Sequence, residues 1–415
     1  MARQSGFRLP RPTTRNLVLL AATVLLAYGA ATNAAVNAFH SNLPSFALSL
    51  NAEDPVALVR DAQLKLAAGS IPPDDGGGAI VGVVRRSVSE LAINPAAFRL
   101  YGLSSATNAD LPGVREQMAI SERMERRDAA TQLWLIEDAV EQNDVARALR
   151  HYDTALRTED STRAVLYPVL TDALESPVIR QRFLRYMNEQ PPWLESFLRF
   201  AVSNTSEPVA IADLAKLSKG FPDGAAYSSL DTELLRQLVT SNDFEAATDH
   251  YRRIEGADPG VLTSLTITEA STDLNRAPVT WQPFSIDGIN PFILASANGE
   301  GALEIESEME AGFNGPVARK LLALDPGGYA LSAKLRGENF GGFDFARWRI
   351  TCAGSSDQAP LVNEEVAFGD AMEINASFAV SDDCPVQLVQ ISAATRVRSG
   401  YVTLIIAEAE LTPSR

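Results

Sequence analysis

The sequence has few of the residues on which metal sites and general-base catalysis depend. Only three histidines, His40, His151 and His250, occur in 415 residues. His151 and His250 have no companion at metal-coordinating spacing. No complete phosphate-binding loop or nucleophile elbow is present, and the many carboxylates show no informative pairing. We therefore predict no catalytic residue, no metal site and no cofactor, in a protein that is not an enzyme.

Positive charge is also scarce, because 36 lysines and arginines face 52 aspartates and glutamates and leave a net charge of −16. The first fifteen residues hold four arginines and no acid, so the rest of the chain carries −20. A body this acidic repels polyphosphates and anionic lipid. We expect neither a nucleic-acid partner nor peripheral attachment to a membrane surface.

An uncharged stretch runs from Asn16 to Asn51 directly after the basic start. Residues 16–39 are long and apolar enough to cross a bilayer of roughly 30 Å, so we predict a membrane anchor there, preceded by a basic cytoplasmic segment, residues 1–15. A cleaved signal peptide is the alternative, because Val36 to Ala38 offers small residues to a signal peptidase. Both readings export the body. We expect a single-pass protein of a bacterial inner membrane with a periplasmic body, or a secreted protein after cleavage.

The two cysteines, Cys352 and Cys384, both lie near the C-terminus. In an exported protein a lone pair indicates a disulfide, with two unrelated buried thiols as the alternative.

Residues 51–276 show the three- and four-residue apolar spacing of helices. Two helix–turn–helix segments align around Asn143 and Asn242, which are 99 residues apart, or three units of 33. That spacing is close to the roughly 34-residue period of tetratricopeptide repeats.

The second helix of each aligned pair resembles that family in its small and aromatic packing positions, which are Ala148, Tyr152, Ala155, Ala247 and Tyr251. Ile136 and Leu235 depart from the family, which places a small residue there. The resemblance implies a helical solenoid that binds a protein partner. His151 and His250 are expected at exposed helix positions beside the packing tyrosines.

Residues 278–415 change to strand alternation, with roughly seven or eight short strands expected, as in a jelly-roll β-sandwich. Trp348 shares strand parity with Ile350 and Cys352, so all three should point into the core. The expected fold class is α+β and multidomain, with a transmembrane helix, a tetratricopeptide-like solenoid and an antiparallel sandwich.

The order of strands and turns from Asp325 to Gln387 resembles carbohydrate-binding jelly-roll modules. Combined with an anchored helical repeat, it resembles proteins associated with bacterial exopolysaccharide production. The resemblance implies a non-enzymatic periplasmic scaffold that contacts polysaccharide or protein through the sandwich. Trp281 is the candidate sugar contact, with core packing as its alternative. A glycan-active enzyme accessory and a secreted soluble glycan-binding protein are the rival functions.

Overall fold

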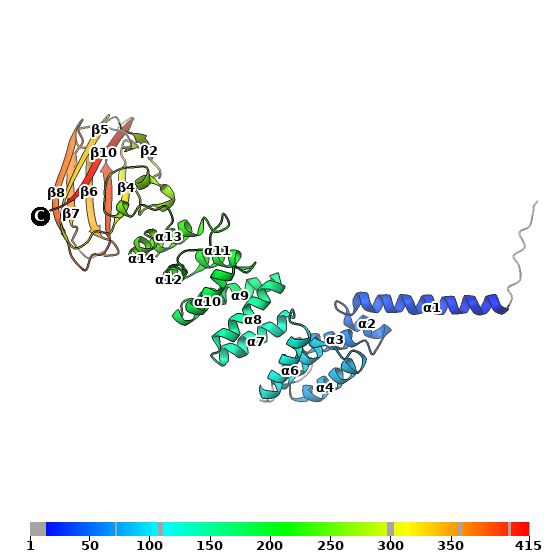
Figure 1. Cartoon of the computed structure of the whole chain (residues 1–415). Coiled ribbons are helices and arrows are strands. Elements are labelled where there is room, and N and C mark those ends of the chain that lie inside the picture. Colours follow the sequence, from blue (N-terminus) through cyan, green and yellow to red (C-terminus); the bar gives the residue numbers. More distant parts are fainter. Residues whose placement is uncertain are drawn as a thin grey trace, which may run out of the picture. The chain divides into compact units, whose positions relative to one another are not determined.

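The computed structural model describes residues 14–70, 73–106, 111–296, 303–355, 359–396 and 400–414. An α-helical part precedes an antiparallel β-sandwich, which confirms the predicted α+β class (Figure 1). The chain forms two compact units, Met1–Thr162 and Arg163–Arg415. Most of the predicted basic segment, residues 1–13, lies outside the described residues.

The described part of the first unit is entirely helical. Its elements are α1 (Thr14–Phe39), α2 (Pro44–Leu50), α3 (Pro55–Ala67), α4 (Pro73–Glu90), α5 (Pro95–Ala106), α6 (Leu111–Met124), α7 (Ala129–Glu141), α8 (Val145–Thr158) and the 3-10 turn η1 (Asp160–Thr162). Successive helices pack in pairs, α5 on α6 and α7 on α8.

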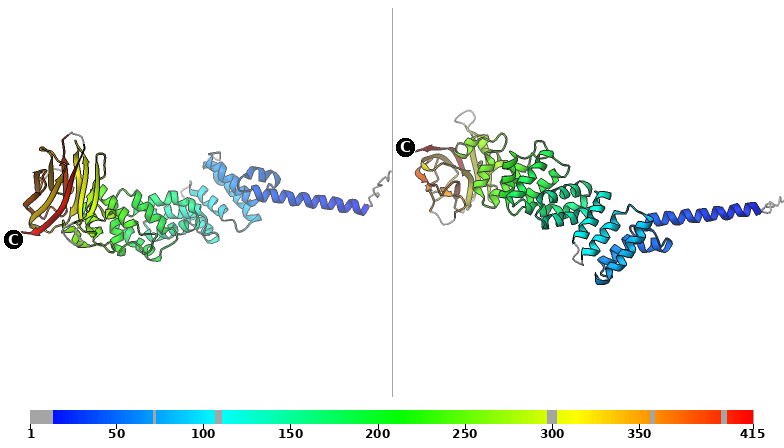
Figure 2. Two further views of the ribbon diagram at one scale, coloured as in Figure 1. Left: turned by 90° about the horizontal axis from the view of Figure 1, so that it is seen from above. Right: turned by 60° about the horizontal axis from the view of Figure 1, so that its bottom comes forward.

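Helix α1 extends away from the other helices of its unit (Figures 1 and 2). Its stretch Val18–Phe39 has 22 residues and a mean hydropathy of 1.6, and its most apolar window is not buried by any part of the protein. Only the end of α1 is packed, where Val36 meets Ala47 and Ala57. The helix is therefore long and apolar enough for the predicted membrane span, or for a signal sequence.

The turn between α7 and α8 shows why the sequence forms a helical pair there. Asn143 has a left-handed φ of 55°, which asparagine tolerates better than most residues. Asp144 then caps α8, its side chain accepting a hydrogen bond of 2.9 Å from the Arg147 amide. Asn242, with a φ of 63°, ends the equivalent first helix in the second unit.

The second unit begins with six α-helices and three described 3-10 turns. They are α9 (Arg163–Ala173), α10 (Pro177–Glu189), α11 (Leu194–Asn204), α12 (Pro208–Ser218), α13 (Leu230–Thr240), α14 (Phe244–Tyr251), η2 (Pro259–Leu262), η3 (Ala270–Thr272) and η4 (Leu274–Arg276). An aromatic cluster in which Phe183, Trp193 and Phe197 are fully buried packs α10 against α11.

Ten described strands form the sandwich. They are β1 (Gln282–Pro283), β2 (Ile289–Ala295), β3 (Leu303–Glu310), β4 (Asn314–Leu322), β5 (Gly327–Glu338), β6 (Phe345–Cys352), β7 (Val362–Ala367), β8 (Met372–Val380), β9 (Gln387–Ala394) and β10 (Tyr401–Pro413). The first sheet has the order β1-β4-β9-β6-β7 and the second sheet the order β2-β3-β10-β5-β8. Neighbouring strands are antiparallel, and the chain passes repeatedly between the two layers (Figure 2).

Alternation along each strand places apolar side chains between the sheets. Trp348, Ile350 and Cys352 of β6 point inward as predicted, and Ile374 and Phe378 of β8 do the same. Strand β10 is central in its sheet, and its residues 402–407 are buried on both faces, as a central strand requires.

The segment before the first strand belongs to the packed interior of the second unit. Leu265 and Ile267 join the sandwich core although they precede residue 278, where the sandwich was expected to begin. The Ala323 amide donates to the Leu262 carbonyl at 2.8 Å, and the Leu303 amide donates to the Ile267 carbonyl at 3.1 Å. The last helices and the sandwich are thus joined by a hydrogen-bonded segment rather than by a bare linker.

Candidate functional site

The outward side of the first sheet is polar because β6 alternates strictly. With Trp348 and Ile350 turned inward, Arg347 and Arg349 must point to solvent, and both are exposed. This arrangement of β6 is the one that the sequence predicted.

The strand register aligns one outward polar residue from each strand of the first sheet. Gln282 pairs with Arg319, Arg319 with Gln390, Gln390 with Arg349, and Arg349 with Asn363. We call these five residues the polar row. The row crosses all five strands and contains only amide and guanidinium groups, each planar and able to make several hydrogen bonds.

Two arginines of this face contact a polar side chain of a neighbouring strand, and a third, Arg349, makes no such contact with a described residue. The Arg319 Nε donates to Gln282 Oε1 at 2.6 Å, and Arg347 Nη2 lies 2.7 Å from Glu365 Oε2. Burial lowers the pKa of Arg319, but a guanidinium remains charged at neutral pH. Arg349 makes no ion pair within the described part of the chain, so its charge is available to a ligand.

Two aromatic side chains, Phe343 and Phe345, lie at the start of β6, six and four residues before Arg349 of the polar row. Phe343 is 68% exposed, and the guanidinium carbon of Arg396 lies 3.7 Å from its ring centre. Phe345 lies on the outward side of β6, and the guanidinium carbon of Arg347 is 5.6 Å from its ring centre. Phe343 was not among the candidate residues predicted from the sequence, although its position after Gly341 and Gly342 in a turn was a signal for an exposed ring.

The outward side of the second sheet is acidic instead. Its outward positions carry the glutamates Glu304, Glu306, Glu308, Glu310, Glu338, Glu373, Glu408 and Glu410. Two cations partly offset them, with Lys334 2.6 Å from Glu408 and Arg336 2.6 Å from Glu304. The two faces of one sandwich therefore differ in the sign of their charge.

Trp281, the predicted sugar contact, is fully buried, so that prediction is wrong. Its indole Nε1 donates to the Leu265 carbonyl at 3.2 Å, and its ring meets Trp348 edge-on at 6.3 Å. The physical reason is the segment before β1, which covers Trp281 with Leu265 and Ile267. The packing alternative is the correct one.

Cys352 and Cys384 form the predicted disulfide, with their Cα atoms 5.4 Å apart. Cys352 ends β6 in the first sheet, and Cys384 lies where the chain crosses from β8 in the second sheet to β9 in the first. The disulfide therefore links the end of β6 to the β8–β9 connection, which passes from one sheet to the other.

The five predicted repeat-packing residues, Ala148, Tyr152, Ala155, Ala247 and Tyr251, are all buried. The expectation of exposed histidines is wrong, since His151 is 7% and His250 is 3% exposed. Each histidine turns toward a polar group of the preceding helix, with His151 Nδ1 2.7 Å from Gln132 Oε1 and His250 Nε2 3.1 Å from Asp231 Oδ1. The His151 contact is a hydrogen bond that pairs one nitrogen of a buried ring, whereas the His250 contact lies within ion-pair distance but lacks hydrogen-bond geometry.

Lys320 of β4 is the most deeply buried cation of the described chain. Its Nζ donates to the carbonyls of Val261 at 2.7 Å and Val279 at 3.0 Å. Burial lowers the pKa of Lys320 from 10.5 to about 7. Because the side chain is wholly enclosed, its role is to join β4 to the segment before β1 and not to meet a ligand. In the described ranges, no group of three or more histidine, cysteine, aspartate or glutamate side chains is arranged to hold a metal ion.

Comparison with known proteins gave structural neighbours only. No protein-family model and no curated protein matches the sequence. About a third of the chain is similar to carbohydrate-binding modules. One is a CBM4 module with 12% identity, a TM-score of 0.24, and coverage of 32% of this chain and 94% of the module. Another is TmCBM61 in complex with beta-1,4-galactotriose, with 13% identity, a TM-score of 0.24, and coverage of 32% and 88%.

A third neighbour is the CBM22-2 xylan-binding domain of Paenibacillus barcinonensis Xyn10C, with 7% identity, a TM-score of 0.24, and coverage of 32% and 91%. The C-terminal sandwich thus resembles carbohydrate-binding modules. At these identities the likeness concerns the fold alone.

Proposed function

We propose that this protein is a membrane-anchored binding protein whose β-sandwich holds an anionic polysaccharide on the outward side of the first sheet. The polar row is the observation that carries the proposal. It places a hydrogen-bonding planar side chain on every strand of one sheet, including the unpaired cation Arg349.

The chemistry of the row suits a sugar chain that bears carboxylates. Guanidinium groups bind carboxylates through two parallel hydrogen bonds, and amides donate to and accept from hydroxyls. With neighbouring strands about 4.8 Å apart, a row across five strands spans roughly 19 Å. That length matches an extended chain better than a single sugar. The exposed ring of Phe343, in the turn before β6, offers a further apolar surface on the sandwich.

The wider role we propose is that of a non-enzymatic periplasmic scaffold in exopolysaccharide assembly or export, whose helical part binds a protein partner. Two features support export. Helix α1 has the length and hydropathy of a membrane span, and the disulfide suits an oxidising compartment.

The direct experiment is a binding titration of the full-length protein in detergent against three polymers. Polygalacturonate should bind, its fully methyl-esterified form should bind at least tenfold more weakly, and a neutral galactan should bind no better than the ester. Rising salt should weaken only the first interaction, because exposed charges are screened. Equal binding of all three polymers, or of none, would contradict the proposal. Release of new reducing ends in the same mixtures would instead favour a glycan-active enzyme accessory.

A further inference from the structure

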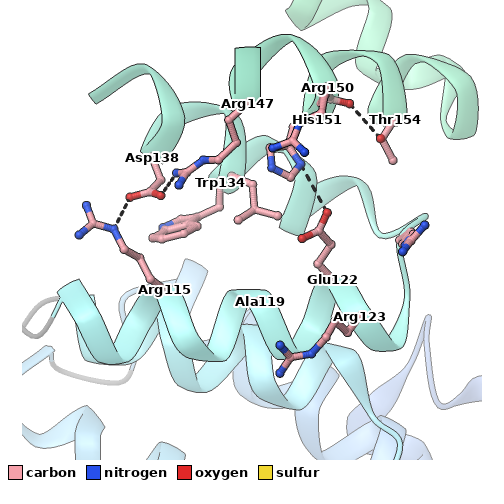
Figure 3. A pocket seen from close by; sticks show the side chains of 12 residues that line it. Arg115, Ala119, Glu122, Arg123, Trp134, Asp138, Arg147, Arg150, His151 and Thr154 are labelled. Atoms are coloured by element: carbon pink, nitrogen blue, oxygen red, sulfur yellow. Dashed lines mark hydrogen bonds and ion pairs between the residues drawn. The ribbon is translucent and has the colours of Figure 1, made fainter. Parts of the chain in front are cut away.

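The first unit contains a pocket that is separate from the sandwich. Helices α6 and α8, the second helices of two consecutive pairs, form its two sides, and α7 lies behind it (Figure 3). Its volume of about 550 Å³ falls within the range of roughly 300–1,000 Å³ that is usual for ligand clefts.

Positive charge dominates the pocket, although the chain as a whole is acidic. Five arginines line it, against the two carboxylates of Glu122 and Asp138. The five are Arg115, Arg123, Arg126, Arg147 and Arg150. An anion would therefore meet an excess of three positive charges there.

Asp138 is already used by the protein. It is buried, with Arg115 Nε 2.7 Å from one oxygen and Arg147 bonded to the other (Figure 3). Burial by itself would raise the pKa of Asp138, but the hydrogen bonds and charges of Arg115 and Arg147 outweigh it and hold that pKa below its usual range. This trio is a closed structural unit.

The other three arginines are free to bind a ligand. Arg123, Arg126 and Arg150 are exposed, and their side chains make no ion pair or hydrogen bond with any described residue. Three guanidinium groups left unpaired around one hollow, in a chain that carries −16, provide a positive site for an external anion.

The pocket also offers a ring and uncharged hydrogen-bonding groups. Trp134 is only partly buried, whereas the other three tryptophans of the chain are at most 1% exposed. Burial lowers the pKa of His151 and so favours the neutral imidazole, with Arg150 and Arg147 adding to this effect and Glu122 and Asp138 opposing it. The Thr154 hydroxyl lies on the same wall as His151.

The equivalent pair in the second unit acts as a natural comparison. Positions 99 residues later keep the buried histidine and its polar partner, His250 with Asp231 in place of His151 with Gln132. The same offset places Asp249 where Arg150 stands and Glu233 where Trp134 stands. Packing of such a pair therefore requires neither the free arginine nor the exposed tryptophan, and another function must account for them.

We propose that this pocket binds a sugar of the uronic acid type. Its carboxylate is held by the guanidinium groups of Arg123, Arg126 and Arg150, and its ring lies against Trp134. An acidic peptide fits less well, because only Ala119, Trp134 and Leu135 offer apolar surface for its side chains. The proposal does not depend on the sandwich, since the pocket lies wholly in the first unit.

The test uses tryptophan fluorescence of the full-length protein in detergent. Because Trp134 is the tryptophan open to solvent, trigalacturonate should protect it from acrylamide quenching and give a saturable titration. The Arg150→Asp and Arg126→Gln variants should each weaken this binding about tenfold or more. Lys219→Asp, a charge reversal at an exposed residue that lines a hollow with His250 in the second unit, should leave it unchanged. Arg349→Glu on the sandwich should also leave it unchanged, which separates this site from the polar row.

Protection by trigalacturonate that is lost in both pocket variants and kept in both controls supports the proposal. Equal protection by the trimethyl ester would overturn it, because no carboxylate would then be recognised. Protection by hexaglutamate but not by trigalacturonate would overturn it in favour of a peptide site. Circular dichroism of each variant ensures that loss of binding is not loss of folding.

Discussion

The two outer faces of the β-sandwich are built by the same fold and yet carry opposite charge. The first sheet presents the polar row, with Arg319 and Arg349, while the second presents eight glutamates against Lys334 and Arg336. Between the sheets the difference disappears, since both inner faces are apolar and meet around Trp348.

This difference shows which part of the sandwich is free to carry function. Strand alternation requires apolar residues inside but allows any polar residue outside. A sheet of outward glutamates folds as well as one of outward arginines and amides, so the contrast is not required for folding. It indicates that only the first face is suited to an anionic ligand.

The largest loss of stability is expected from substitutions in the core between the two sheets. Trp348→Ala removes a fully buried ring that packs on Trp281, and should lower the free energy of unfolding by about 3–5 kcal/mol. The outward neighbour Arg349→Ala should change it by less than about 0.5 kcal/mol. Denaturant unfolding of both variants measures the difference. A similar loss in both would show that the outward side is also structural.

The next largest loss of stability is expected when the Cys352–Cys384 disulfide is removed. Cys352→Ala or Cys384→Ala should lower the unfolding free energy by about 2–4 kcal/mol, because the bond closes a loop with a sequence separation of 32 residues. The double variant should be no less stable than either single variant. Thermal melts of the three proteins test this, and additive losses would assign separate packing roles to the two side chains.

A smaller effect, on the pH dependence of stability, is expected from Lys320. Burial lowers its pKa from 10.5 to about 7, so between these values the unfolded chain binds a proton that the folded chain does not. The free energy of unfolding is therefore highest above pH 10.5, where Lys320 is neutral in both the folded and the unfolded chain. It decreases as the pH falls toward 7, because the unfolded chain then gains a proton that the folded chain does not. Raising the pH from 7 to 9 should therefore stabilise the wild type relative to Lys320→Met, by on the order of 1 kcal/mol per pH unit. Identical pH dependence of the two proteins would refute a lowered pKa.

Much of the fold could be predicted from the sequence because it follows from spacing. The uncharged N-terminal stretch, the inward parity of Trp348 and the disulfide partners all depend on periodicity or on residue type, and each agrees with the structure. The Asn–Asp turns at Asn143 and Asn242 were recognisable for the same reason. Assignment of the helices to the tetratricopeptide family stays a prediction.

The candidate site could not be predicted, because it depends on register between distant strands. Gln282, Gln390 and Asn363 lie far apart in the sequence and meet only through the order β1-β4-β9-β6-β7. Trp281 was misjudged because Leu265, sixteen residues earlier, folds over it. The buried histidines were missed because their partners, Gln132 and Asp231, lie on the preceding helix.

The central claim, that only the first face binds an anionic polysaccharide, is tested by two variants with the same change of charge. Arg349→Glu reverses the free cation of the polar row, and Lys334→Glu reverses an exposed cation of the second face. The measurement is equilibrium binding of polygalacturonate at physiological salt, with both variants made in a full-length protein that also carries Arg150→Asp, so that the pocket of the first unit does not contribute. We predict that Arg349→Glu weakens binding at least tenfold, or about 1.4 kcal/mol, while Lys334→Glu changes it less than twofold. Equal losses in the two variants, or full binding by Arg349→Glu, would contradict the account.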